Sequence, residues 1–253
     1  MRDMHCHILP GVDDGARDLA ESLAMLEAAK AAGVTSIVCT PHCRDPYFDY
    51  DAMWDAYEEL VAHADGFPLT MGFEVNHAKL MELGMDWADY LGFDGGREFL
   101  LELSIRASRA EYDVYERTIF ELQGRGFEVI IAHPERYRAI QDDLSLAQRL
   151  VDMGCKLQAS ADFVEGGRFG KEKKPARKLF EAGLYSYVGS DAHCVEHYRN
   201  LAEVHEQYGL DGGANVPAGP PPGATVLPPE PDFGASEPAE PDDEPVRGKH
   251  ART

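Results

Sequence analysis

The sequence contains no long apolar run, few basic residues and no closely spaced cysteine pair. No stretch of about 18 apolar residues occurs, so we expect no membrane-spanning helix. The 24 Lys and Arg residues stand against 45 Asp and Glu, a net charge of −21, and this balance argues against a nucleic-acid-binding protein. The five cysteines form no C-x-x-C pair, and the first residues lack the apolar region of a signal peptide, which favours a reduced, cytoplasmic protein.

One kind of phosphate chemistry is excluded by the positions of these cysteines. A phosphatase that uses a cysteine nucleophile in a Cys-x5-Arg motif needs an arginine six residues after that cysteine. The five positions in question hold Val12, Asp45, Asp49, Ala161 and Asn200. We therefore expect no cysteine mechanism of this type, and we expect Cys6, Cys39 and Cys155 to be core residues.

The composition of the chain changes near Asp211. The segment from Asp211 to Thr253 holds ten of the sixteen prolines, together with eight acidic and three basic residues. Such a segment buries too little apolar surface to order itself. We expect residues 1–209 to fold as one domain and residues 210–253 to form a disordered tail, either a solubilising extension or a linker to a partner.

Within residues 1–209, short β-branched and apolar runs alternate with stretches of helical period. Seven strands are expected, at 2–7, 35–42, 69–75, 99–103, 128–134, 156–161 and 185–193. Helical spacing recurs between them, as in Leu19, Leu23 and Leu26, and glycines precede later strands, as at Gly126. Because no Gly-rich phosphate loop follows the first strand, we favour a distorted parallel α/β barrel over an open doubly wound sheet.

Six of the seven expected strands end in residues that can bind a metal. His5 and His7 are two residues apart, so both side chains project from one face of a strand. The carboxyl ends of barrel strands form the active site, where we expect eight ligands to meet: His5, His7, His42, Glu74, Glu102, His133, Asp191 and His193. The set contains no thiolate and exceeds the needs of one ion, which predicts two or three ions of Mn²⁺, Fe or Zn²⁺.

Several charged residues near these strand ends suit phosphate chemistry. Arg136 follows His133 by three residues and Arg199 follows Asp191 by eight, and a guanidinium binds phosphate oxygens bidentately. Asp13 and Asp14 either orient ligands or cap the first helix near Asp14. The basic stretch 166–178 either attracts an anionic phosphopeptide or is a solvated helix start.

The motifs "HCHILPGVDDGA", "CTPH", "GFEV", "LLEL", "AHPER" and "GSDAH" give the chain a family resemblance over residues 1–200. The sequence resembles the polymerase and histidinol phosphatase (PHP) superfamily, and more narrowly the bacterial manganese-dependent tyrosine-protein phosphatases encoded with capsule and exopolysaccharide genes. The resemblance implies a distorted (β/α)7 barrel with a trinuclear site, the eight ligands above with Glu102 as bridging candidate, and Arg136 and Arg199 as phosphate-holding arginines. It implies as substrate the phosphotyrosine tail of a bacterial kinase.

The chain departs from this family in two places. Cys194 replaces the usual Asn after "SDAH", and the apolar helix expected after the barrel has no counterpart, the Pro-rich tail standing in its place. The oligomeric state of the protein remains open.

Three functions remain open at this point. The first is hydrolysis of protein phosphotyrosine by attack of a metal-bound hydroxide on phosphorus, with Arg136 on the equatorial oxygens and His42 as a candidate proton donor to the phenolate. The second is hydrolysis of a small phosphomonoester, such as histidinol phosphate, or of a nucleotide phosphodiester. The third, a non-catalytic metal-binding module, is the least favoured because all eight ligand positions are filled.

Overall fold

The structure is a computed structural model that describes residues 1–208. The expected tail at 210–253 lies outside the described residues, so its disorder stays a prediction. The strands are β1 (Arg2–Cys6), β2 (Ser36–Cys39), β3 (His42–Cys43), β4 (Leu69–Met71), β5 (Glu74–Asn76), β6 (Glu98–Glu102), β7 (Glu128–Ala132), β8 (Lys156–Ser160) and β9 (Tyr187–Gly189).

Helices follow most of these strands. The α-helices are α1 (Leu19–Ala31), α2 (Tyr50–His63), α3 (His77–Leu83), α4 (Ala88–Leu91), α5 (Tyr112–Gly124), α6 (Arg138–Asp142), α7 (Ser145–Asp152), α8 (Lys173–Glu181) and α9 (His197–Tyr208). Short 3₁₀ helices are η1 (Met85–Trp87), η2 (Arg109–Glu111), η3 (Pro134–Arg136) and η4 (Ala161–Glu165). None of the helices within residues 1–208 is both long and apolar enough to span a bilayer.

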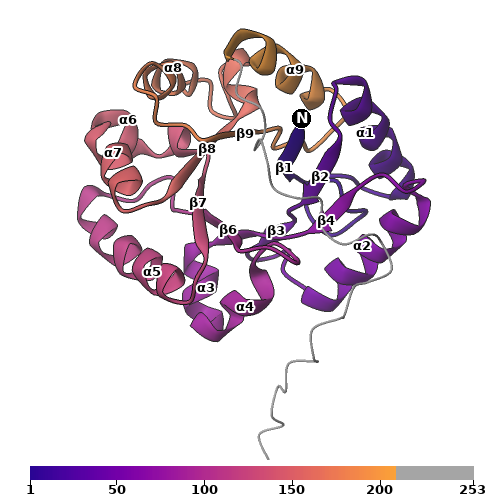
Figure 1. Cartoon of the computed structure of the whole chain (residues 1–253), viewed down its shortest axis with the longest axis horizontal. Helices are drawn as coiled ribbons and strands as arrows, with labels where there is room; N and C mark the ends of the chain where they lie inside the picture. The colour runs from indigo at the N-terminus through magenta and orange to yellow at the C-terminus, as the bar shows by residue number, and fades with distance from the viewer. Residues whose placement is uncertain (209–253) are drawn as a thin grey trace, which may run out of the picture.

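The strands form two parallel sheets that curl around a common centre, with the helices outside them (Figure 1). One sheet has the order β1-β2-β4 and the other has the order β3-β5-β6-β7-β8-β9. The first and last strands lie side by side, because Asp191 N donates to His5 O at 2.7 Å and His7 N donates to Ala192 O at 2.9 Å. The fold is therefore a mixed α/β fold with a strongly curled parallel sheet.

All seven expected strand segments contain strands, but two of them are broken in the middle. The segment 35–42 divides into β2 and β3 around Pro41, and the segment 69–75 divides into β4 and β5 around Gly72. Proline has no N–H to donate to a sheet, and a Cβ at Gly72 would lie 2.5 Å from the Phe93 ring, so both positions interrupt regular pairing. Each of these two segments thus leaves one sheet and enters the other. Its second half carries a predicted ligand, His42 in β3 and Glu74 in β5.

One helix prediction needs correction. Helix α1 is capped by Asp18, whose side chain accepts a hydrogen bond from Glu21 N at 2.9 Å, and not by a residue near Asp14. The expected lack of an apolar helix where the Pro-rich tail stands concerns positions outside the described residues, so it stays a prediction. Helix α9 follows β9 and buries Tyr198, Leu201 and Val204, which a 3.6-residue period in this segment signals.

Candidate metal centre

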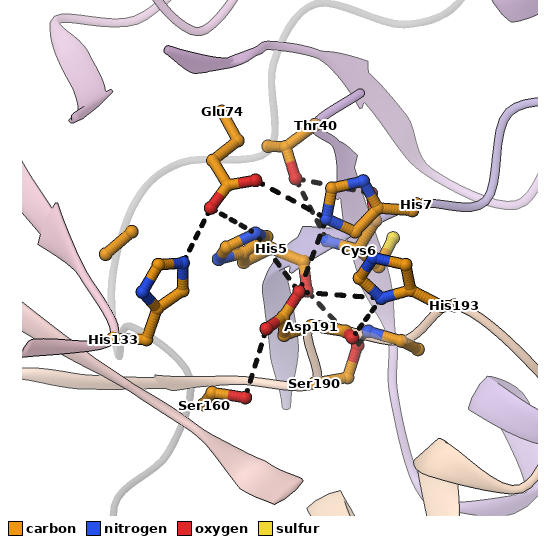
Figure 2. Close-up of polar contacts among 12 residues, drawn as sticks. His5, Cys6, His7, Thr40, Glu74, His133, Ser160, Ser190, Asp191 and His193 are labelled. Carbon is orange, nitrogen blue, oxygen red and sulfur yellow. Dashed lines mark hydrogen bonds and ion pairs between the residues drawn. The ribbon is translucent and has the colours of Figure 1, made fainter. Parts of the chain in front are cut away.

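The carboxyl ends of the strands bring all eight predicted ligands to one place. They come from β1, β3, β5 and β6 and from the segments that follow β1, β7 and β9. The side chains belong to four overlapping groups, each with ligand atoms within 4.8 Å of one another: His7, Asp14, His42 and His193; His5, His7 and Glu74; His5, His133 and Asp191; Glu74, Glu102 and His133. Figure 2 shows several of these imidazoles and carboxylates pointing toward one another.

His5 in β1 and His7 directly after it are each oriented by a hydrogen bond between the ring Nδ1 and a side-chain oxygen. His5 Nδ1 lies 2.9 Å from Gln158 Oε1, and His7 Nδ1 lies 2.8 Å from Asp13 Oδ2. Oxygen acceptors at Nδ1 place the ring proton there and leave Nε2 with a lone pair. The buried Nε2 atoms of both rings have no hydrogen-bond partner within residues 1–208, as expected for atoms that bind a metal.

Glu74 lies at the centre of the cluster. Its Oε1 is 2.7 Å from His133 Nε2, and its Oε2 is 2.5 Å from His42 Nδ1. Glu102 lies at the edge instead, with Oε1 4.0 Å from His133 Nε2 and Oε2 accepting a hydrogen bond from Asn76. Glu74 thus contacts imidazoles through both of its oxygens, whereas Glu102 contacts one imidazole from the edge of the cluster.

Asp14 lies in the ligand cluster. From the sequence, Asp14 was expected either to orient ligands or to cap the first helix. Its Oδ1 lies 3.1 Å from His42 Nε2 and 3.4 Å from His193 Nε2. Asp13 is the residue that orients: its Oδ2 also accepts a hydrogen bond from the backbone N–H of His42. The two adjacent aspartates thus have different roles. Asp14 faces the cluster, and Asp13 orients His7 and His42 by hydrogen bonds.

Two of the predicted ligands have a backbone conformation that is unfavourable for residues other than glycine. His133 has φ +33° and Asp191 has φ +49°, both in the left-handed region. Such conformations cost about 1–3 kcal/mol each and concentrate at functional sites. The hydrogen bonds that His133 N and Asp191 N donate to Gln158 O and His5 O hold both residues in place.

The cluster's charges are balanced by close contact between acids and imidazoles. Burial lowers the pKa of His5, but Asp191 and Glu74 outweigh this effect and raise it to about 10. Burial likewise lowers the pKa of His42, whereas Glu74 and Asp14 raise it to about 9. The carboxylates raise these pKa values because they favour positive charge beside them, and a divalent cation would supply that charge instead.

Arg136 reaches the centre from η3. It is buried, and its Nη2 donates to Asp191 Oδ2 at 2.5 Å, to Asp162 Oδ2 at 3.0 Å and to Ser160 Oγ at 3.1 Å. Arg199, in contrast, is exposed on α9 and does not line the cavity in front of the cluster. The structure thus brings Arg136 to the site and does not bring Arg199 there.

A cavity of about 370 Å³ opens in front of the cluster. Its wall includes the ligand candidates Asp14, Asp191 and His193, and also Arg136 and Arg168. Carboxylates and imidazoles on one side and guanidinium groups nearby can together bind cations and a phosphate group that bridges them.

The residues present fit a centre of more than one divalent ion. The donors are nitrogen and oxygen, they form overlapping groups, and the Nε2 atoms of His5, His7 and His193 are buried without a hydrogen-bond partner in the described part of the chain. Burying such atoms without a ligand is costly. Which metal they bind stays a prediction.

Sequence reasoning missed three residues that the structure places at this site. Gln158 is polar in the middle of a buried strand, a signal that was available in the sequence. Asp162 follows that strand, and Arg168 belongs to the basic stretch, but their approach to the cavity depends on how the loop after β8 folds. His42, predicted both as ligand and as proton donor, contacts Glu74 through Nδ1, while its Nε2 lies 2.7 Å from Arg44 Nη2.

Comparison with known proteins agrees with this geometry. The family model described as "Capsular polysaccharide synthesis, CpsB/CapC" matches residues 1–206. The chain is 33% identical over 219 residues to the tyrosine-protein phosphatase YwqE of Bacillus subtilis, covering 83% of this chain and 84% of YwqE. It is 30% identical over 213 residues to the tyrosine-protein phosphatase CpsB of Streptococcus pneumoniae, covering 78% and 84% of the two chains.

A solved structure is similar over the same region. It is described as YwqE from Bacillus subtilis and CpsB from Streptococcus pneumoniae, "unique metal-dependent tyrosine phosphatases". It matches with a TM-score of 0.70 and 32% identity, covering 83% of this chain and 88% of the other. From these matches and its clustered ligands, the chain belongs to the CpsB/CapC family of capsular polysaccharide synthesis.

Proposed function

We propose that this protein is a metal-dependent protein-tyrosine phosphatase. The observation that carries the proposal is the cluster of nine His, Asp and Glu side chains, three of which line one cavity together with the buried Arg136. The similarity to proteins named tyrosine-protein phosphatases gives the substrate class. The substrate we propose is a phosphotyrosine-bearing segment of a bacterial tyrosine kinase that acts in capsule or exopolysaccharide synthesis.

Three finer features belong to the same proposal. The seven strand segments form a distorted (β/α)7 barrel, in which β2–β3 and β4–β5 each count as one broken strand. The centre holds two or three ions, most simply Mn²⁺, since the donors are imidazole and carboxylate without thiolate. His5, His7, His42, Glu74, Glu102, His133, Asp191 and His193 are the proposed ligands, with Asp14 added by the geometry.

The side chains of the site have separate roles in the proposed reaction. When bound, the ions neutralise the phosphate oxygens and lower the pKa of the attacking water. Arg136 binds the non-bridging oxygens, since its buried Nε has no hydrogen-bond partner within the described residues and remains available as a donor. The leaving phenolate has a pKa of about 10, so it needs little help from an acid such as His42.

The experiment that tests this function compares three substrates after chelation. Hydrolysis of a phosphotyrosyl peptide, histidinol phosphate and a nucleotide phosphodiester is measured with and without added Mn²⁺. We expect the peptide to be preferred and its hydrolysis to depend on Mn²⁺. Preference for histidinol phosphate or the diester would be compatible with the proposed metal centre but would contradict the proposed tyrosine phosphatase activity.

Two variants separate metal binding from phosphate binding. We expect His133→Ala to lose activity together with bound metal, because His133 contacts the central Glu74. Arg136→Ala should retain metal and lower kcat by about 10²–10³-fold, the usual effect of removing one transition-state donor. Thiol alkylation is the control and should leave activity largely intact, since Cys6, Cys39, Cys43 and Cys155 are buried and only Cys194 is partly exposed.

A further inference from the structure

A basic segment begins at the cavity in front of the metal centre. Between η4 and the first turns of α8, residues 166–178 hold six basic residues and a single acid, Glu172, in a chain of net charge −21. We call this segment the basic arm. Since it follows β8, its first residues lie at the same end of the sheet as the predicted ligands.

The arm's loop is folded around Glu172 and is not a loose connection. Glu172 is fully buried, and its carboxylate accepts hydrogen bonds from Phe169 N at 3.0 Å and Lys171 N at 2.8 Å. Gly167 N donates to Asp162 O at 2.9 Å, and Glu172 N donates to Gly166 O at 3.1 Å. The one acid of the arm is therefore used internally and does not neutralise the basic side chains outside.

Arg168 is the inner end of the arm. It lines the same cavity as Arg136, and its Nη2 lies 3.5 Å from Asp14 Oδ2. Its side chain is 48% exposed, so it faces both the ligand cluster and the solvent. A phosphate bound at the cluster would thus have cationic side chains on two sides of the cavity.

The outer part of the arm carries exposed cations that have no acidic partner. Within residues 1–208, Lys171, Lys174, Arg177 and Lys178 are exposed and form no ion pair. Lys173 differs, since its Nζ donates to Val164 O at 2.6 Å and helps to hold the loop. Cations in the first turn of a helix oppose the helix dipole, so Lys174 does not serve the stability of α8.

Acidic side chains form part of the cavity wall beside the arm. Asp14, Asp162 and Glu165 all line the cavity. Acidic residues beside the phosphotyrosine of a substrate would be repelled by these carboxylates and attracted by the arm. The charges therefore favour an orientation in which the substrate leaves the cavity along the arm.

We propose that the basic arm binds acidic residues that flank the phosphotyrosine of the substrate, with Arg168 next to the phosphate and Lys171, Lys174, Arg177 and Lys178 along the flanking chain. The inference rests on the proposed tyrosine phosphatase activity and adds a preference within it. The partner it names is an acidic phosphotyrosyl segment.

The test compares two peptides that differ only in charge. One has three glutamates on each side of phosphotyrosine, and the other has glutamines at the same positions. We expect the wild-type protein with Mn²⁺ to favour the Glu peptide by about three- to tenfold in kcat/KM at low salt, as a few exposed ion pairs would give, and to lose the preference at high salt. The Lys171→Glu/Lys174→Glu variant should abolish the preference through KM.

A charge-matched control variant separates docking from net charge. Arg97 and Lys156 stand at the amino ends of β6 and β8, away from the metal centre, and Arg97→Glu/Lys156→Glu changes the net charge equally. This variant should keep the preference, and both variants should hydrolyse p-nitrophenyl phosphate at the wild-type rate, which also reports correct folding.

The outcomes distinguish this inference from the function on which it rests. Equal rates on the two peptides, or a preference that survives in the Lys171→Glu/Lys174→Glu variant, would overturn the basic arm alone. No hydrolysis of either phosphotyrosyl peptide would overturn the tyrosine phosphatase and the arm together.

Discussion

At the scale of single residues, the centre depends on side chains that never face the cavity. Gln158 and Asp13 fix the Nδ1 atoms of His5 and His7, and so turn each Nε2 toward the cluster. Partners of this kind set the ring orientation and the basicity of the ligand. Burial raises the pKa of Asp13, but its contacts with His7 outweigh burial and lower it to about 2, so Asp13 supplies a full negative charge.

This arrangement predicts the effect of removing that charge. Asp13→Asn keeps the shape of the side chain but makes the acceptor for His7 Nδ1 neutral, so we expect Mn²⁺ affinity to fall about 10–100-fold. Calorimetric titration of Mn²⁺ into the chelated protein measures the change. The control is Asp18→Asn, at the N-cap of α1, where Asn is equally suitable. Equal affinity of the Asp13 variant and the wild type would contradict the supporting role.

At the scale of elements, the loop that begins the basic arm is shaped by glycines. Gly167 has φ +73°, and a Cβ there would lie 2.7 Å from Glu172 Cβ, whereas Gly170 has φ +70° with nothing within 4 Å of an added Cβ. Both positions carry the backbone cost of a left-handed residue, but only Gly167 also meets a buried side chain.

The two glycines therefore form a matched pair. We expect Gly170→Ala to lower the free energy of unfolding by about 1 kcal/mol and Gly167→Ala to lower it by about 1–3 kcal/mol more. Urea denaturation followed by tryptophan fluorescence measures both. If the two substitutions cost the same, the packing of the loop on Glu172 does not contribute to stability.

The arrangement of strands and helices also explains which parts of the site could be predicted from the sequence. The clustering of the eight predicted ligands follows from strand periodicity and from the rule that functional side chains lie at the carboxyl ends of parallel strands. The breaks at Pro41 and Gly72 were not predicted, because each segment reads as one apolar run and only packing against Phe93 and the second sheet reveals the division. The exposed position of Arg199 likewise depends on the rotation of α9, which spacing from Asp191 does not determine.

At the scale of the whole molecule, the metal centre joins parts of the chain that are distant in sequence. His5 lies in the first strand and Asp191 follows the last strand, and the cluster also takes Glu74 from β5 and His133 from the segment after β7. Ions bound there would connect both sheets across the line where β1 meets β9. Any ligand that binds only the folded chain shifts the folding equilibrium toward it.

Metal binding should therefore stabilise the entire fold and not only the site. At a free Mn²⁺ concentration of one hundred times Kd, the gain is about 2.7 kcal/mol, or about 5–10 °C in Tm for a domain of this size. Differential scanning calorimetry of the chelated protein with increasing Mn²⁺ measures this gain. Ca²⁺ at the same concentrations is the control, because it screens the net charge of −21 equally but prefers oxygen ligands to a cluster with five histidines. A Tm that rises equally with both ions would mean that screening of the acidic chain, and not ligation by the strands' carboxyl ends, stabilises the protein.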